Sequence, residues 1–235
     1  MPLADLQWVR KYVSQKLGDD RIQVERITKA VLQENADELC NVGSWIIYVI
    51  MHLLSHNTIR IFSSSPVNKV LLAYGIEGIQ PLVNILVYGL NEEYVELVDN
   101  ELMKEGYHSF DQRHRLLLAR LYSARWHAAV AILGLLKRSR NKNLSESEYS
   151  YVLIAKNAAY ILRDKINDWK NICKRYAHTA PGAAALRDIN DIEKMLNEIL
   201  DICKQADLRI QPNAPLASRR LIRRSRGSSG LPKPR

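Results

Sequence analysis

The sequence is poor in the residues that build disulfide frameworks and many-turned β folds. Its 235 residues include only 3 cysteines, 10 glycines, 8 prolines and 2 phenylalanines. A small, odd number of cysteines cannot form a disulfide framework and is typical of a reducing compartment. So few glycines and prolines argue against a β-sandwich or barrel. We therefore expect an ordinary apolar core, which a chain of this length is long enough to bury.

The sequence also lacks the signals of export, membrane insertion and familiar enzyme classes. Its N-terminus is an amphipathic mixture rather than a basic stretch followed by an apolar one. The strongly apolar run at residues 45–54 is too short for a membrane span, which needs about 20 residues. Walker, dinucleotide-binding, nucleophile-elbow and zincin motifs are absent. We expect an intracellular protein, cytoplasmic or nuclear, with no transmembrane segment, cofactor or catalytic residue; an enzyme without a known motif is the open alternative.

Metal binding is not expected either. His52 and His56 lie four residues apart, but Leu53, Leu54 and Ser55 between them supply no carboxylate or thiol to complete a tetrahedral site. The three cysteines are far apart and fall on predicted apolar faces, which is typical of core thiols. These are Cys40, Cys173 and Cys203.

Apolar residues recur at three- and four-residue steps nearly throughout, which predicts an all-α fold. We expect about eight helices in a compact, bundle-like body. Capping residues and breakers mark their limits. The helix starts are expected near Leu6, Asp20, Asn35, Ser63, Pro81, Asn91, Ser109 and Ser145, with the Asn35 helix running through Leu54, breaks at Gly18, Gly75 and Gly106, and a short extended piece at 58–62. Asn35–Glu38, Ser109–Gln112 and Ser145–Glu148 have capping-box spacing.

The last two predicted helices form an antiparallel hairpin. Two apolar seams with alternating three- and four-residue spacing flank the turn at residues 179–182. They are too short to stand alone, so the hairpin should pack on the body or on a second copy. The first seam is Ala155, Ala159, Leu162, Ile166, Trp169, Cys173 and Tyr176, and the second is Ala185, Ile189, Ile192, Leu196, Ile199 and Cys203. The expected domains are residues 1–140 (helical body with a basic long helix), 144–206 (hairpin) and 207–235 (disordered Arg-rich tail).

The positive charge is concentrated in two segments. The chain has 34 Lys and Arg against 25 Asp and Glu, a net charge of +9. Residues 113–143 hold eight basic residues and no acidic one, and residues 206–235 hold eight basic residues and one acidic one. The remainder therefore carries 18 basic and 24 acidic residues. Segregation of this kind favours contact with a polyanion.

The first basic segment is a candidate phosphate-binding helix. Arg113, Arg120 and His127 are each seven residues apart and lie within about 40° of one another on a helix. Arginines on a mostly apolar helix are expected to lie at the rim of a groove, where each guanidinium could bind a phosphate through two hydrogen bonds. The candidates are Arg113, Arg115, Arg120, Arg125, Lys137, Arg138 and Arg140. The alternative is that these residues pair with the acidic helix upstream and complement the helix dipole. Tyr122 and Trp126 on this helix are candidates for base stacking, although such rings more often pack between helices.

The second candidate is the C-terminal tail, with Arg219, Arg220, Arg223, Arg224 and Arg226. An arginine-rich arm binds RNA or DNA backbones by charge and counterion release. A nuclear-import signal or a contact with an anionic membrane are the alternatives. In layout, a helical body with a basic groove and a basic arm resembles small RNA-coating nucleoproteins, including viral nucleocapsid-like ones.

We therefore predict a non-enzymatic protein that binds nucleic acid, RNA more than DNA, and self-associates through its helices. A helical adaptor whose tail only localises it is the first alternative. A peripheral membrane or matrix-like layer protein is the second.

Overall fold

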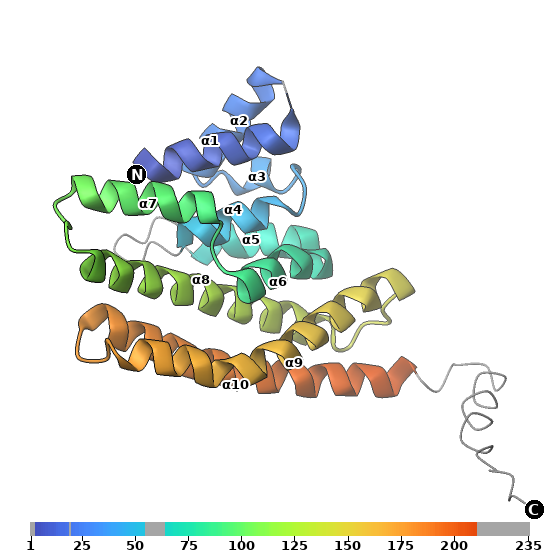
Figure 1. The fold of residues 1–235 in the computed structure, drawn as a ribbon. Helices are drawn as coiled ribbons and strands as arrows, with labels where there is room; N and C mark the ends of the chain where they lie inside the picture. The colour runs from blue at the N-terminus through green and yellow to red at the C-terminus, as the bar shows by residue number, and fades with distance from the viewer. Residues whose placement is uncertain (1–2, 19, 55–63, 211–235) are drawn as a thin grey trace, which may run out of the picture.

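Helices make up all the regular structure of the described residues, which are 3–18, 20–54 and 64–210 of the computed structural model. The predicted all-α fold class is confirmed (Figure 1). The elements are α1 (Leu3–Leu17), α2 (Arg21–Leu32), α3 (Ala36–Leu39), α4 (Ile46–Leu54), α5 (Ser64–Tyr74), η1 (Gly75–Gly78), α6 (Ile79–Tyr88), α7 (Glu92–Lys104), α8 (Phe110–Ser139), α9 (Glu146–Lys174) and α10 (Ala180–Ile210).

One predicted helix proves to be two. Asn35 caps a helix as expected, accepting from the backbone N–H of Glu38, but that helix is only the short α3. The chain then turns at Gly43, whose φ of 126° favours glycine, before α4 begins. The hydroxyl of Tyr74 accepts from the N–H groups of Val42 (3.1 Å) and Gly43 (2.7 Å). These bonds satisfy backbone donors that a continuous helix would have used.

The segment around α5 and α6 is long and apolar enough to cross a membrane by composition. It is residues 66–88, and 56% of its most apolar window is buried inside the protein. The 3₁₀ turn η1 interrupts it after α5, where Gly75 takes a φ of 54°. Because α6 packs against α4, α8 and α9, burial in the core is sufficient to explain this composition.

The long helix α8 crosses the molecule between the N-terminal helices and the C-terminal hairpin (Figure 1). The loop before it follows α7, which Asn91 caps by accepting from the N–H of Tyr94 at 3.2 Å. The capping box predicted at Ser109 and Gln112 is wrong, because the Ser109 side chain makes no capping hydrogen bond. The predicted length of α8, to about Lys137, is correct within two residues.

The C-terminal hairpin is the element that the sequence predicted best. Ser145 and Glu148 form the expected reciprocal capping box at the start of α9. Both seams are buried, apart from the last residue of the first, Tyr176, which is half-buried. The hairpin packs on the body, mainly through α10 on α8 and α9 on α6. The turn lies slightly earlier than expected, because α10 already begins at Ala180.

Close packing fixes the residue at the start of α10. A Cβ added at Gly182 would lie 2.0 Å from the carbonyl oxygen of Tyr176. Only glycine lets the two backbones approach this closely. The predicted extended piece at 58–62 and the predicted disordered tail beyond Ile210 lie outside the described residues.

Candidate nucleic-acid interface

Arg113, at the N-terminal end of α8, is buried rather than presented to a ligand. Its side chain keeps only 10% of its surface exposed, and its Nε donates to the Asp99 carboxylate at 2.8 Å. Its Nη1 donates to the carbonyls of Tyr107 (3.0 Å) and His108 (2.9 Å). These bonds fasten the α7–α8 connection. The alternative interpretation, pairing with the acidic helix upstream, therefore describes Arg113 better than a phosphate contact does.

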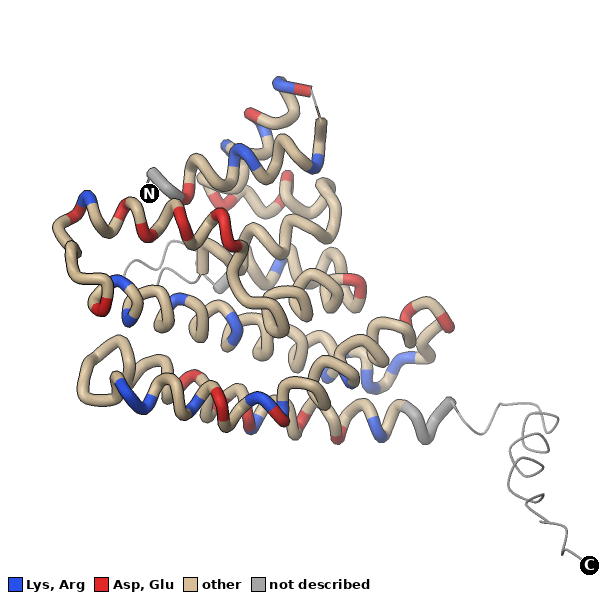
Figure 2. The backbone as a smooth tube through the Cα atoms, in the orientation of Figure 1, with Lys and Arg blue, Asp and Glu red and all other residues tan. Residues whose placement is uncertain are grey.

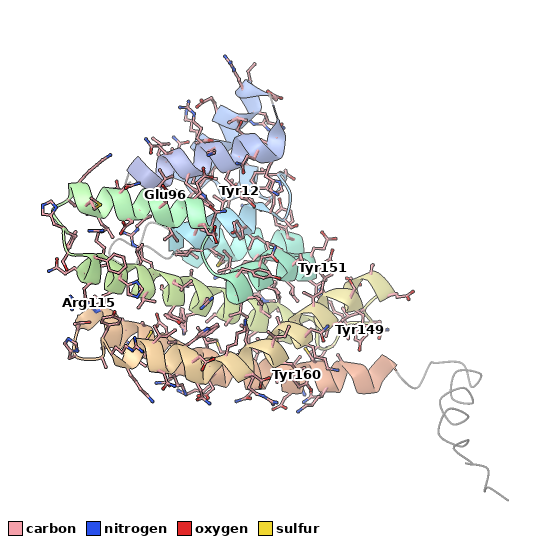
Figure 3. The ribbon with its side chains drawn as sticks, in the orientation of Figure 1. Tyr12, Glu96, Arg115, Tyr149, Tyr151 and Tyr160 are labelled. Carbon is pink, nitrogen blue, oxygen red and sulfur yellow. The ribbon has the colours of Figure 1, made fainter. Side chains whose placement is uncertain are left out.

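The next two candidates are half-buried on the same helix. Arg115 pairs with Asp111 one turn away, with 3.0 Å between Nη2 and Oδ2, and lies near the start of α8 (Figure 3). Arg120 follows on the face that Arg113 shares, and His127 continues that line. Burial lowers the pKa of His127 below its ordinary value. The line that we expected to form a groove rim therefore follows a face that the fold largely covers.

Arg125 lies in the core between α6, α8 and α9. Its guanidinium carbon lies 4.1 Å from the centre of the Trp169 ring and 5.4 Å from that of Tyr122, which is cation–π geometry. Its Nη2 donates to the carbonyl of Val87 at 3.4 Å, whereas the buried Nε has no hydrogen-bond partner among the described residues. Burial lowers its pKa, and Tyr122 opposes that shift. Arg125 is a packing residue.

The candidate aromatic residues of α8 divide in the same way. Tyr122 is buried, with its ring centre 5.6 Å from that of Trp169, so it packs between helices. Trp126 is half-buried, and its ring meets that of His127 edge-on at 4.9 Å. Neither ring is positioned as an open stacking platform.

The C-terminal end of α8 is different, because its basic side chains are largely exposed. Lys137 pairs with Glu198 of α10 at 2.6 Å, with about half of each side chain in solvent. Arg138, Arg140 and Lys142 follow and are all exposed. Figure 2 shows Lys and Arg gathered where α8 ends and the chain turns into α9. We call Arg138, Arg140 and Lys142 the basic loop.

Two acidic residues follow the basic loop at the start of α9. Glu148 is engaged in the capping box, and hydrogen bonds from Ser145 lower its pKa. Glu146 and Glu148 both lie in the first turn, where a negative charge complements the helix dipole. Lys142 of the basic loop makes a smaller contribution to the lowered pKa of Glu148, so this carboxylate interacts with both Ser145 and the basic loop.

A cavity of about 290 Å³ opens beside the basic loop. Arg140 and Lys142 line one side, and Ile202, Gln205 and Ala206 of α10 line the other. The described residues end with α10 at Ile210, four residues after the lining residue Ala206, and the arginine-rich segment follows in the sequence. The tail candidates themselves, Arg219, Arg220, Arg223, Arg224 and Arg226, lie outside the described residues.

The α10 side of this cavity was missed by sequence reasoning, although the hairpin contained the necessary information. An antiparallel hairpin with matched seams places the start of α9 beside the end of α10. The residues that precede the tail must therefore lie near the α8–α9 loop.

Metal and thiol chemistry find no support in the described part of the chain. It holds no group of three or more His, Cys, Asp or Glu residues that could bind a metal ion. Cys173 and Cys203 are buried and Cys40 is half-buried, all as free thiols. Burial raises the pKa of Cys173 to about 11, which leaves it a poor nucleophile at neutral pH.

Comparison with known proteins adds no relative: no protein-family model, no curated protein and no solved structure matches this chain. Its charge, its fold and the geometry of the basic end must therefore support any functional proposal by themselves.

Proposed function

We propose that the protein binds nucleic acid, RNA in preference to DNA, through the end of the molecule that carries the basic loop and the start of the tail. One observation carries this proposal. Arg140 and Lys142 line the same cavity as the last described side chains of α10, from which the arginine-rich tail continues. The first basic segment (113–143) therefore ends beside the residue at which the second (206–235) begins.

The exposure of these residues favours phosphate binding. An exposed Lys or Arg is already hydrated, so little desolvation opposes its contact with a phosphate, and counterion release supplies the gain. The three residues of the basic loop and the five tail arginines provide eight cations for a nucleic-acid backbone. Arg113 and Arg125 are left out of the interface, because their buried guanidinium groups already serve the fold.

The proposal includes self-association of the kind a nucleoprotein needs, with no enzymatic step. Its support is the outer side of α9, where large apolar side chains remain exposed: Leu153, Tyr160, Ile161 and Ile172. Figure 3 shows Tyr160 on this helix. Such residues are candidates for burial against a second copy. Sedimentation should show oligomers that Ile161→Glu with Ile172→Glu converts to monomers, and a monomeric wild type would contradict this part.

RNA binding itself is tested by fluorescence anisotropy with a single-stranded oligonucleotide. Between 50 and 200 mM salt we expect the affinity to fall at least about 100-fold, since about six phosphate contacts release their counterions. Deleting residues 212–235 should weaken binding while leaving the circular dichroism of the body unchanged. An affinity that is insensitive to both changes would contradict the proposal.

The same protein should be mixed with phosphatidylserine vesicles without RNA. Flotation with the vesicles and no affinity for RNA would replace the proposal with the peripheral-membrane function. Failure to bind either would leave the adaptor function, in which the tail only localises the protein.

A further inference from the structure

The cavity beside the basic loop combines three kinds of surface. Its floor is apolar and consists of Leu136, Leu144, Val152 and Ile202, of which all but Leu144 are buried. Three residues with amide side chains line it, Asn141 and Asn143 from the α8–α9 loop and Gln205 from α10. Arg140 and Lys142 add two cations, and the lining residues among those whose side chains the structure describes include no carboxylate.

We infer that this cavity takes one unpaired nucleobase of the bound RNA, with the adjoining phosphate held by Arg140 and Lys142. The inference rests on the proposed function, because the tail and the basic loop must first bring the strand to this end of the molecule. It goes further in assigning a pocket for a base, where the proposed function assigns only contacts with phosphates.

Each part of the lining matches one part of a nucleotide. The faces of a base are apolar and suit the Leu136, Val152 and Ile202 floor. Its edges carry donors and acceptors, which amide side chains recognise by paired hydrogen bonds in unpaired RNA. The phosphate is an anion that arginine binds in bidentate fashion.

Other ligand classes match the lining less well. The two cations of the described lining, Arg140 and Lys142, favour an anionic ligand over a cation. A fully apolar ligand would make no use of the amide side chains and the two cations, and a free phosphate would leave the apolar floor uncovered. The volume of about 290 Å³ lies at the lower end of ligand pockets, which suits one base rather than a larger ligand.

The cavity can be filled by a substitution that leaves every charged residue unchanged. Ala206 lines it from α10 and is half-buried, so Ala206→Phe places a ring where the base would lie. Ala73→Phe is the matched control, since Ala73 is exposed on α5 and does not line the cavity. Both variants are made in the full-length chain, and circular dichroism checks that each folds.

Two anionic probes separate the base from the phosphates. One is a single-stranded oligouridylate, and the other is a ribose-phosphate oligomer of the same length without bases. Wild type should bind the oligouridylate about 10-fold more tightly, because a sequestered base adds to the phosphate contacts. Ala206→Phe should abolish that difference and leave the affinity for the abasic oligomer unchanged, whereas Ala73→Phe should behave as wild type.

The possible outcomes distinguish a failure of the base pocket from a failure of RNA binding itself. If wild type binds both oligomers equally, or if folded Ala206→Phe retains the 10-fold preference, the base pocket is wrong and the phosphate interface stands. If wild type binds neither oligomer, the proposed function itself fails. Should Ala206→Phe not fold, Asn143→Ala with Gln205→Ala decides, because losing the amides should reduce the preference for bases and leave abasic binding intact.

Discussion

The two ends of α8 carry the same kinds of residue in opposite environments. Near the N-terminal end and the middle of α8, Arg113 and Arg125 are buried and engaged by acceptors or aromatic rings. At the C-terminal end, Arg138, Arg140 and Lys142 are exposed, and Arg140 and Lys142 line a cavity. In the sequence alone, each of these residues contributes one positive charge, whatever its position. The fold divides them into structural cations and cations that remain accessible to a polyanion.

The largest expected effect comes from truncating Arg125. Arg125→Ala removes its ring contacts and leaves a void between α6, α8 and α9, which should lower the free energy of unfolding by about 3 kcal/mol. Arg125→Met should stay within about 1 kcal/mol of wild type, because a buried cation without full hydrogen bonding is replaced by an apolar chain of similar length. Urea denaturation measures both. A Met variant as unstable as the Ala variant would show that the charge itself holds the site.

Arg113 should behave differently, because its role is hydrogen bonding. Both Arg113→Ala and Arg113→Met should cost about 2–3 kcal/mol, since each leaves the Asp99 carboxylate and two carbonyls without their donor. Lys142→Ala, at the exposed end of α8, should cost less than about 0.5 kcal/mol. Equal effects on urea unfolding at Arg113 and Lys142 would remove the distinction between the two ends.

A pH effect of about 2 kcal/mol is expected in the N-terminal helices. Burial lowers the pKa of His52 to about 3, and the hydrogen bond from Nδ1 to the Tyr48 carbonyl (2.8 Å) opposes part of that shift. Nε2 accepts from the Asn91 N–H at 2.8 Å, which suits the neutral ring. The unfolded chain has a histidine pKa near 6.5, so it binds the proton that the folded state excludes. The stability is therefore complete above about pH 7 and falls by about 2 kcal/mol by pH 5. Urea unfolding at both pH values tests this, ideally in the Asp188→Asn background described next; a flat profile there would contradict it.

The C-terminal hairpin should show a smaller effect of opposite sign. Burial raises the pKa of Asp188 to about 6; Arg187 opposes the shift and Asp191 reinforces it. The folded state therefore holds a proton that the unfolded chain has lost, and this contribution to stability disappears as the pH rises from about 4 through 6. After allowance for partial exposure, Asp188→Asn should stabilise the protein by about 1 kcal/mol at pH 8. The gain should vanish at pH 5, and a constant gain across this range would show that ionisation is not its cause.

The fold was largely predictable because its signals are local. The seams around Leu162 and Ile192, the Ser145–Glu148 capping box and the break at Gly75 depend on residues within one or two turns. The prediction failed where local signals were equivocal. The capping residue Asn35 precedes an apolar run, and nothing within a turn of it shows that the chain leaves the helix before Gly43.

The candidate site was less predictable, because the burial of an arginine is a tertiary property. Spacing placed Arg113 and Arg120 on one face but could not show that α7 brings Asp99 to that face. Likewise, the sequence of α8 does not indicate that Trp169, more than forty residues later, packs against the Arg125 guanidinium. The exposure of the basic loop was easier to predict, because a polar segment between two helices is expected to lie at the surface.

We propose that RNA meets the exposed basic loop at the end of α8 rather than the buried arginines Arg113 and Arg125. The most direct measurement is the salt dependence of RNA affinity for Arg138→Gln/Arg140→Gln/Lys142→Gln against a control, Arg21→Gln/Lys29→Gln, which neutralises exposed residues of α2. We expect the slope of log affinity against log salt to fall by about two for the basic-loop variant, at about 0.7 per lost phosphate contact on a single strand. The control should keep the wild-type slope. Equal slopes for wild type, basic-loop variant and control would contradict the account.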